Sequence, residues 1–174
     1  KRQILSFLPK GSYLVGGYIR DIILKKVTEK VDVDIVVPFN AIEIGKMISD
    51  NVKSKFIILD KEREVVRIIL NHISIDISNQ ISSTIEGDLR SRDFSINSIA
   101  FLFHKKLLFD PLNGLKDLQF SLLKTYSEIN LLDDPLRILR CFRFVSELNF
   151  TIDLKLVDFI TKNKEKLFLV AKER

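Results

Sequence analysis

Val31-Asp32-Val33-Asp34-Ile35-Val36-Val37 is a run of β-branched residues that carries two aspartates and is followed by Pro38. β-branched residues favour extended backbone and proline interrupts it, so we predict a buried strand over residues 31–37. Side chains two positions apart on a strand face the same way, which puts Asp32 and Asp34 side by side. Two adjacent carboxylates repel each other unless a cation bridges them, and oxygen ligands of this kind suit Mg²⁺. The alternative is a strand end whose aspartates lie at the rim and bond to backbone.

A second motif precedes this strand. Residues 12–24 read as a short apolar strand, a glycine pair and a helix. Gly16 and Gly17 let the backbone approach a ligand closely, and the free N–H groups at the start of the helix favour an anion. Arg20 falls on the first turn, where a positive charge opposes the helix dipole and needs a partner such as a triphosphate. Together with the paired aspartates of the next strand, this order of elements indicates nucleotidyl transfer.

Composition limits the class of protein. The 174 residues are 46% hydrophobic, enough to bury a core in one or two domains. No apolar run approaches the length of about 20 residues that spans a bilayer, and no signal peptide is visible, so we expect a cytoplasmic protein with no membrane partner. The net charge of +5 favours a polyanionic partner. The chain begins at Lys1 and ends in a charged run, residues 172–174, so we expect it to be part of a longer protein.

The pattern of apolar residues predicts an α/β (α+β) fold, a mixed sheet flanked by helices and followed by a helical segment. The predicted helices are 40–51, capped by Asn40, two short helices at 84–90 and 95–100, and a helical pattern from residue 134 to the end. The further predicted strands are 55–59, 64–70, 72–78, 101–103 and 107–109.

Asp76 is a third candidate carboxylate. In the alternating run Ile73–Ile77 it shares a face with Ser74 and Ser78. If this strand neighbours the strand of residues 31–37, Asp76 lies near the metal site. The alternative is a solvent-facing polar stripe on an edge strand.

Arg92 and Asp93 fall between the two short predicted helices. An arginine–aspartate pair beside Asn97 offers a clamp for phosphate and an acceptor for a ribose hydroxyl. Asp93 is also well placed to cap the second helix, and the two roles are compatible.

Residues 133–144 combine a helix start with a row of arginines. Proline favours the first helical position, so Asp134 before Pro135 is the predicted N-cap. Three apolar residues form a predicted seam at every third position: Leu136, Leu139 and Phe142. Three arginines repeat at the same interval beside them: Arg137, Arg140 and Arg143. A carboxylate acceptor and a guanidinium donor one turn apart, Asp134 and Arg137, match the hydrogen-bonding edge of a base. The alternative is an exposed basic face with a capped start.

These motifs, in this order, resemble the class II tRNA nucleotidyltransferase and bacterial poly(A) polymerase family of the polymerase-β-like superfamily. The resemblance runs from about residue 11 to residue 150 and includes Asp110-Pro111-Leu112-Asn113-Gly114-Leu115-Lys116-Asp117-Leu118. It implies a nucleotidyltransferase head over residues 1–128 and the beginning of a nucleotide-selecting helical neck over residues 129–174. Residues 110–118 would be the hinge between them, and body and tail domains would lie beyond Arg174.

The resemblance also implies roles for individual residues. Asp32 and Asp34 would be the catalytic carboxylates that bind Mg²⁺. Asp76, by its place on its own strand and not by the resemblance, is the third candidate catalytic carboxylate. The nucleotide-binding residues would be Gly16, Gly17, Arg20, Arg92, Asp93, Asn97, Asp134, Arg137, Arg140 and Arg143. Among these, Gly17 and Arg20 would hold the triphosphate, while Asp134 and Arg137 would pair with the base of CTP or ATP.

The implied activity is template-independent addition of C and/or A to the 3′ end of tRNA. The alternatives are poly(A) addition to other RNAs, a non-catalytic nucleotide- or RNA-binding relative, and a small-molecule nucleotidyltransferase. Intact Asp32 and Asp34 argue against a non-catalytic relative, and a small-molecule enzyme would not need the helix that carries Asp134 and Arg137.

Two positions depart from the family pattern. Asp133 stands where many members carry glutamate. Only Ile77–Ser83 separate Asp76 from the next predicted helix, and members that switch from CTP to ATP have a longer mobile loop in this interval. We therefore expect an enzyme that adds C residues and stops before the terminal A.

Overall fold

The strand predicted over residues 31–37 is β2 (Val31–Val37), an inner strand of a seven-stranded mixed sheet in this computed structural model, which describes residues 2–165. The sheet order is β3 (Lys55–Asp60), β4 (Val65–Leu70), β5 (Ile73–Asn79), β2, β1 (Tyr13–Val15), β6 (Ala100–Leu102) and β7 (Leu107–Phe109). Strands β2 and β5 run parallel, and the other neighbours are antiparallel. The predicted α/β (α+β) fold is confirmed.

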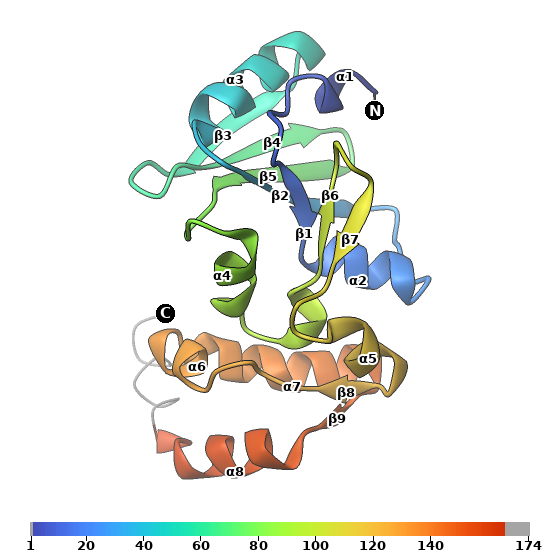
Figure 1. The fold of residues 1–174 in the computed structure, drawn as a ribbon, viewed down its shortest axis with the longest axis vertical. Coiled ribbons are helices and arrows are strands. Elements are labelled where there is room, and N and C mark those ends of the chain that lie inside the picture. Colours follow the sequence, from blue (N-terminus) through green and yellow to red (C-terminus); the bar gives the residue numbers. More distant parts are fainter. Residues whose placement is uncertain (1, 166–174) are drawn as a thin grey trace.

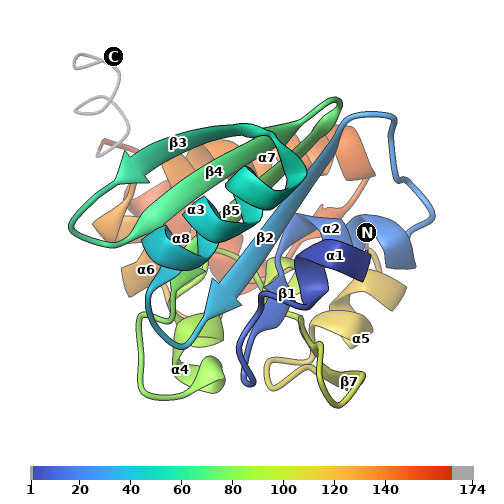
Figure 2. The ribbon, with the colours of Figure 1, turned by 90° about the horizontal axis from the view of Figure 1, so that it is seen from above.

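One face of the sheet is covered by α1 (Arg2–Leu5) and α3 (Ala41–Val52), as Figure 2 shows. Ile44 and Ile48 of α3 pack on the buried side chains of β4 and β5. A Cβ at Gly45 would lie 2.5 Å from the Val66 Cγ2, so glycine lets α3 sit close to β4. The predicted helix 40–51 is therefore confirmed, and its apolar stripe is the one that reaches the sheet.

Asn40 stands at the N-cap position of α3, as predicted, but it does not cap the helix with its side chain. Asn40 adopts a left-handed conformation, with φ of 56°, and its side chain makes no capping bond. The first free N–H, of Ala41, instead donates to the side chains of Glu64 and Asn79. The helix is thus capped by residues distant in sequence, which a local pattern does not reveal.

The other face of the sheet carries the remaining helices, below it in Figure 1. They are α2 (Gly17–Ile23), α4 (Ile85–Arg90), the 3₁₀ turn η1 (Ser95–Asn97), α5 (Gly114–Gln119), α6 (Ile129–Asp133), α7 (Leu136–Leu148) and α8 (Leu154–Lys162). Within residues 2–165, no helix is long and apolar enough to cross a membrane.

One hydrophobic cluster joins these helices. It includes Ile19 of α2, Phe94, Leu131 of α6, and Ile138 and Phe144 of α7. The cluster therefore crosses residue 128, where we predict the head to end. That boundary stays a prediction, but the two segments share one core.

Two predicted helical stretches are shorter in the structure. Of the predicted helix 95–100, only Ser95–Asn97 are helical, as η1, and Ala100 already belongs to β6, because it pairs with Val15 of β1. The serine hydroxyls of this segment bond elsewhere, Ser98 to the Phe94 carbonyl and Ser95 to Asp117, which competes with helix formation.

The helical pattern after residue 134 is interrupted at Asn149, whose φ is 59°. There β9 (Thr151–Ile152) pairs in parallel with β8 (Leu122–Leu123), before α8 begins. The final part of the predicted helical pattern, residues 166–174, lies outside the described residues.

The predicted apolar seam of α7 is wrong. Leu139 and Phe142 are half exposed, and the residues that α7 buries are Ile138, Cys141 and Phe144. Two apolar faces run along this helix, and periodicity alone does not tell which one meets the core. The predicted arginine row lies along one edge of the face that is buried.

Candidate active site

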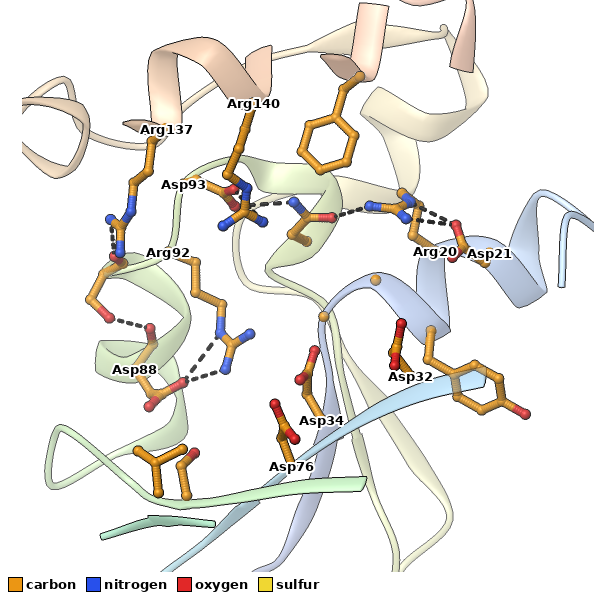
Figure 3. A pocket seen from close by; sticks show the side chains of 18 of the residues that line it. Arg20, Asp21, Asp32, Asp34, Asp76, Asp88, Arg92, Asp93, Arg137 and Arg140 are labelled. Carbon is orange, nitrogen blue, oxygen red and sulfur yellow. Dashed lines mark hydrogen bonds and ion pairs between the residues drawn. The ribbon is translucent and has the colours of Figure 1, made fainter. Parts of the chain in front are cut away.

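The three aspartates lie together on the sheet. Asp32 and Asp34 project from β2, and Asp34 pairs in register with Asp76 of the parallel strand β5. Figure 3 shows the Asp34 and Asp76 carboxylates next to each other, with Asp32 further along β2. Because β5 lies between β4 and β2, the alternative of an edge strand for Asp76 is wrong.

Asp76 has a partner that the sequence did not reveal. Arg67 of β4 is directly across from it in antiparallel register and donates Nε and Nη2 to its two carboxylate oxygens, at 2.7 and 2.8 Å. Both oxygens are thus engaged by a bidentate ion pair. A catalytic role for Asp76 stays a prediction.

Burial raises the pKa of Asp34 above the ordinary range of an aspartate, and the nearby Asp76 and Asp32 carboxylates add to that rise. The Arg92 and Arg140 guanidinium groups oppose it. Negative charge on Asp34 is therefore costly in the protein alone, which favours a cation beside it.

Gly16 brings the backbone against this carboxylate. Its φ is +77°, in the region that favours glycine, and an added Cβ would lie 2.7 Å from Asp34 Oδ2 and 3.4 Å from Arg92 Nη1. A side chain at this position would displace Asp34. The glycine pair predicted as a ligand-approach site thus also makes room for the carboxylate.

A cavity of about 1220 Å³ opens between the sheet and α7. The predicted site residues that line it are Gly16, Gly17, Arg20, Asp32, Asp34, Asp76, Arg92, Asp93, Asn97, Arg137, Arg140 and Arg143. Asp134 is not among the lining residues, whereas its neighbour Asp133 is. The Asp134 carboxylate accepts a hydrogen bond from the Leu136 N–H at 3.1 Å, at the start of α7.

A chain of polar contacts crosses the cavity from α7 to α2 (Figure 3). Arg140 Nη2 lies 2.9 Å from Asp93 Oδ2, and Asp93 Oδ1 accepts from Asn97 Nδ2 at 3.0 Å. Asn97 Oδ1 accepts from Arg20 Nη1 at 2.7 Å, and Arg20 also donates to Asp21. Four predicted site residues are thereby joined in one network.

Phe144 is a residue of this site that the sequence analysis missed. Its ring is 3% exposed, and three guanidinium groups lie 5.0 to 5.8 Å from its centre: Arg20, Arg140 and Arg143. A ring face attracts cations, so Phe144 reduces the repulsion among the arginines. The pattern offered a hint, because Phe144 lies one turn after Arg140.

The carboxylates fit a divalent cation that takes few protein ligands. Among residues 2–165, no group of three or more histidine, cysteine or acidic side chains is placed to hold a metal ion. Asp32 and Asp34 would supply two ligands, and water and substrate phosphates the others. This division is the usual one for Mg²⁺.

Residues 12–124 match the family described as the poly(A) polymerase head domain. The chain belongs to this family. Its nucleotidyltransferases use a divalent metal. The match covers β1 to β8 and therefore includes the three aspartates of the sheet.

Members with related activities are similar to this chain. A CC-adding tRNA nucleotidyltransferase of Synechocystis is 39% identical over 98% of this chain and 41% of that protein. An A-adding tRNA nucleotidyltransferase of Deinococcus radiodurans is 35% identical over 88% of this chain and 34% of that protein. A solved CCA-adding enzyme in complex with CTP has a TM-score of 0.78 and 33% identity, over 89% of this chain and 37% of that one. The chain spans less than half the length of these relatives.

We predict that Asp34→Asn stabilises the metal-free protein at neutral pH. The folded state holds the Asp34 proton more tightly than the unfolded chain does, so ionisation destabilises the fold as pH rises above the ordinary aspartate pKa. The melting temperature of the variant, measured by calorimetry in EDTA, should exceed that of the wild type at pH 7. The difference should shrink as pH falls toward about 4. Asp50→Asn, on the exposed side of α3, is the control, and a lower melting temperature for Asp34→Asn at pH 7 would contradict the assignment.

Proposed function

We propose that this chain carries the nucleotidyl-transfer site of a cytoplasmic enzyme that adds C residues to the 3′ end of tRNA. The observation that carries the proposal is the shared cavity, which has the Asp32 and Asp34 carboxylates on one wall and the arginines of α7 on the other. The names of the relatives, which include CC-adding tRNA nucleotidyltransferases, support the choice of substrate.

The reaction joins the RNA to the nucleotide in one displacement. The 3′-hydroxyl oxygen forms a bond to the α-phosphorus of CTP, the bond from that phosphorus to the bridging oxygen breaks, and pyrophosphate leaves with the electron pair. The hydroxyl proton passes to solvent. Mg²⁺ held by Asp32 and Asp34 would lower the pKa of the hydroxyl and neutralise charge on the leaving group.

The other side chains would bind and orient the nucleotide. Arg92, whose guanidinium lies near Gly16 and acts on the Asp34 carboxylate, would meet a phosphate or ribose oxygen. Arg20 is engaged by Asp21 and Asn97, so it would hold the triphosphate with the donors that these bonds leave free. Asp76 would fix the adjacent strand β4 through its ion pair with Arg67. Its carboxylate adds to the rise of the Asp34 pKa that burial causes, whereas the Arg67 charge compensates part of the Asp76 contribution.

The base would lie against the start of α7. Arg137 lines the cavity and offers donors. Asp134 does not line it, but its Oδ2 lies 3.9 Å from the Arg137 Nε, so it would serve as the acceptor with its side chain turned toward the base. A donor and an acceptor together complement the edge of cytosine, which presents an acceptor ring nitrogen and a donor amino group. Uracil presents the opposite pattern, so the pair would reject UTP.

The link between β5 and α4 favours C addition over A addition. Only Gln80–Thr84 separate the two elements. Among the bonds that hold this link are those from Gln80 N–H to Val37 O, from Ile81 N–H to Asp88 Oδ1, and from Gly87 N–H to Thr84 Oγ1. Little chain is left there to move when a larger purine must be accepted. The A-adding relative favours the second candidate, terminal A addition.

We predict that Asp32→Ala and Asp34→Ala each reduce incorporation of labelled CTP into a tRNA transcript lacking its CC end to background, because each removes a metal ligand. The assay uses the full-length protein with Mg²⁺. Asp158→Ala, on the exposed face of α8, should keep wild-type activity. Wild-type turnover by either β2 variant would contradict the assignment of Asp32 and Asp34 as the metal ligands.

A second prediction concerns base selection. Arg137→Ala should lower the ratio of kcat/KM for CTP over UTP by about tenfold or more, because a group fitted to a base edge is worth roughly 1–3 kcal/mol of discrimination. Arg140→Ala should weaken both nucleotides alike, since its partner is Asp93. If Arg137→Ala slows both equally, Arg137 anchors the nucleotide without reading the base.

A third prediction separates C addition from A addition. Full-length protein given ATP and a tRNA that ends in CC should add no A, whereas CTP and a tRNA without CC should give addition of two residues. Efficient A addition would favour CCA or A addition and overturn the argument from the short link.

A further inference from the structure

Helix α4 ends at Arg90, and three successive carbonyl groups lie at and just beyond this end: those of Arg90, Ser91 and Arg92. Such groups need partners from elsewhere when they are partly buried. Here the partners come from α6 and α7, about 40 residues later in the chain. Side chains of α6 and α7 thus donate the hydrogen bonds that satisfy the carbonyls at the end of α4.

Asn130 of α6 provides two of these bonds. Its Nδ2 donates to the Arg90 carbonyl at 2.6 Å and to the Arg92 carbonyl at 2.8 Å. Arg137 provides the third, since its Nη1 donates to the Ser91 carbonyl at 3.0 Å. The same Nη1 also donates to the backbone carbonyl of Asn130 at 3.0 Å.

These two bonds hold the Nη1 end of the Arg137 guanidinium. Nη1 is committed to two carbonyls, so the plane of the group is fixed while Nε and Nη2 keep donors for a ligand. The Arg92 carbonyl is held by the same asparagine, and the Arg92 side chain lies 3.2 to 3.3 Å from the Asp88 carboxylate of α4. Asn130 therefore lies between Arg137, which would contact the base of the nucleotide, and Arg92, which would contact its phosphates.

We propose that Asn130 is a positioning residue for base selection. Its side-chain amide bonds the carbonyls on either side of Ser91, and so fixes the Ser91 carbonyl that holds the Arg137 guanidinium. The inference rests on the proposed function. Asparagine suits the role because a single amide nitrogen carries two hydrogens for two carbonyls. Aspartate has nearly the same shape but offers no donor, and its charge would repel both carbonyl oxygens.

The test compares Asn130→Asp and Asn130→Ala with the wild type in the full-length protein. We expect both variants to lower the ratio of kcat/KM for CTP over UTP by about tenfold, comparable to the 10- to 100-fold effect of removing a residue that orients a metal ligand. Asn51→Asp is the matched control, because Asn51 also donates Nδ2 to a backbone carbonyl, that of Met47, but on the remote helix α3. The control should leave the ratio unchanged.

A double-mutant comparison shows whether Asn130 acts through Arg137. In an Arg137→Ala background, Asn130→Asp should lower the CTP-over-UTP ratio by less than twofold further, because the group that it orients is gone. A further tenfold loss would overturn the inference. So would a purely structural result, in which Asn130→Asp lowers the melting temperature and slows both nucleotides equally.

Failure of the inference about Asn130 can be told apart from failure of the proposed function. If the wild type does not incorporate CTP, the proposed function is wrong and the inference falls with it. If the wild type incorporates CTP and both Asn130 variants keep its base preference, only the inference is wrong.

Discussion

The buried carboxylate of Asp93 constrains how the two walls of the cavity meet. Asp93 is 4% exposed, and its Oδ1 accepts bonds from the Phe94 N–H and the Asn97 amide. Within residues 2–165, its Oδ2 has no hydrogen-bond partner, and charge compensation comes from Arg140, whose Nη2 lies 2.9 Å away. An uncompensated buried charge is strongly destabilising, so α7 must lie against the turn that follows Asp93.

Docking of α7 on this turn determines where the other cations lie. With Arg140 at Asp93, the ring of Phe144 comes under Arg20 and Arg143, and Arg137 reaches the end of α4. Positive charge is thereby gathered opposite the β2 carboxylates. A nucleoside triphosphate with its divalent cation complements this arrangement, because its phosphates would face the arginines and its cation the carboxylates. The hydrophobic cluster shared by α2, α6 and α7 supports the same placement with apolar contacts.

The sequence predicted those features of the site that depend on local pattern. The β-branched run located β2, strand periodicity placed Asp32 and Asp34 on one face, and the glycine pair marked the turn before α2. The neighbouring position of Asp76 was one of two alternatives, and strand order decided between them. The pattern also located the arginine row, although it chose the wrong apolar face of α7.

The remaining features arise from contacts between segments that are far apart in the chain. Arg67 meets Asp76 only because β4 and β5 pair in one register. Asn130 and Phe144 become part of the site through the packing of α6 and α7 on the turn near Asp93. Asn130 belongs to no motif, and the arginine row gave only a hint of Phe144. The cap of α3 by Glu64 and Asn79 has the same origin.

The central claim is that one cavity holds the triphosphate at β2 and the base at α7. A crystal structure of the full-length protein with CTP and Ca²⁺, a cation that supports binding better than turnover, tests it most directly. We expect the cation between the triphosphate and the Asp32 and Asp34 carboxylates, with the cytosine edge against Arg137. A triphosphate bound away from β2, or a base directed away from α7, would contradict the account.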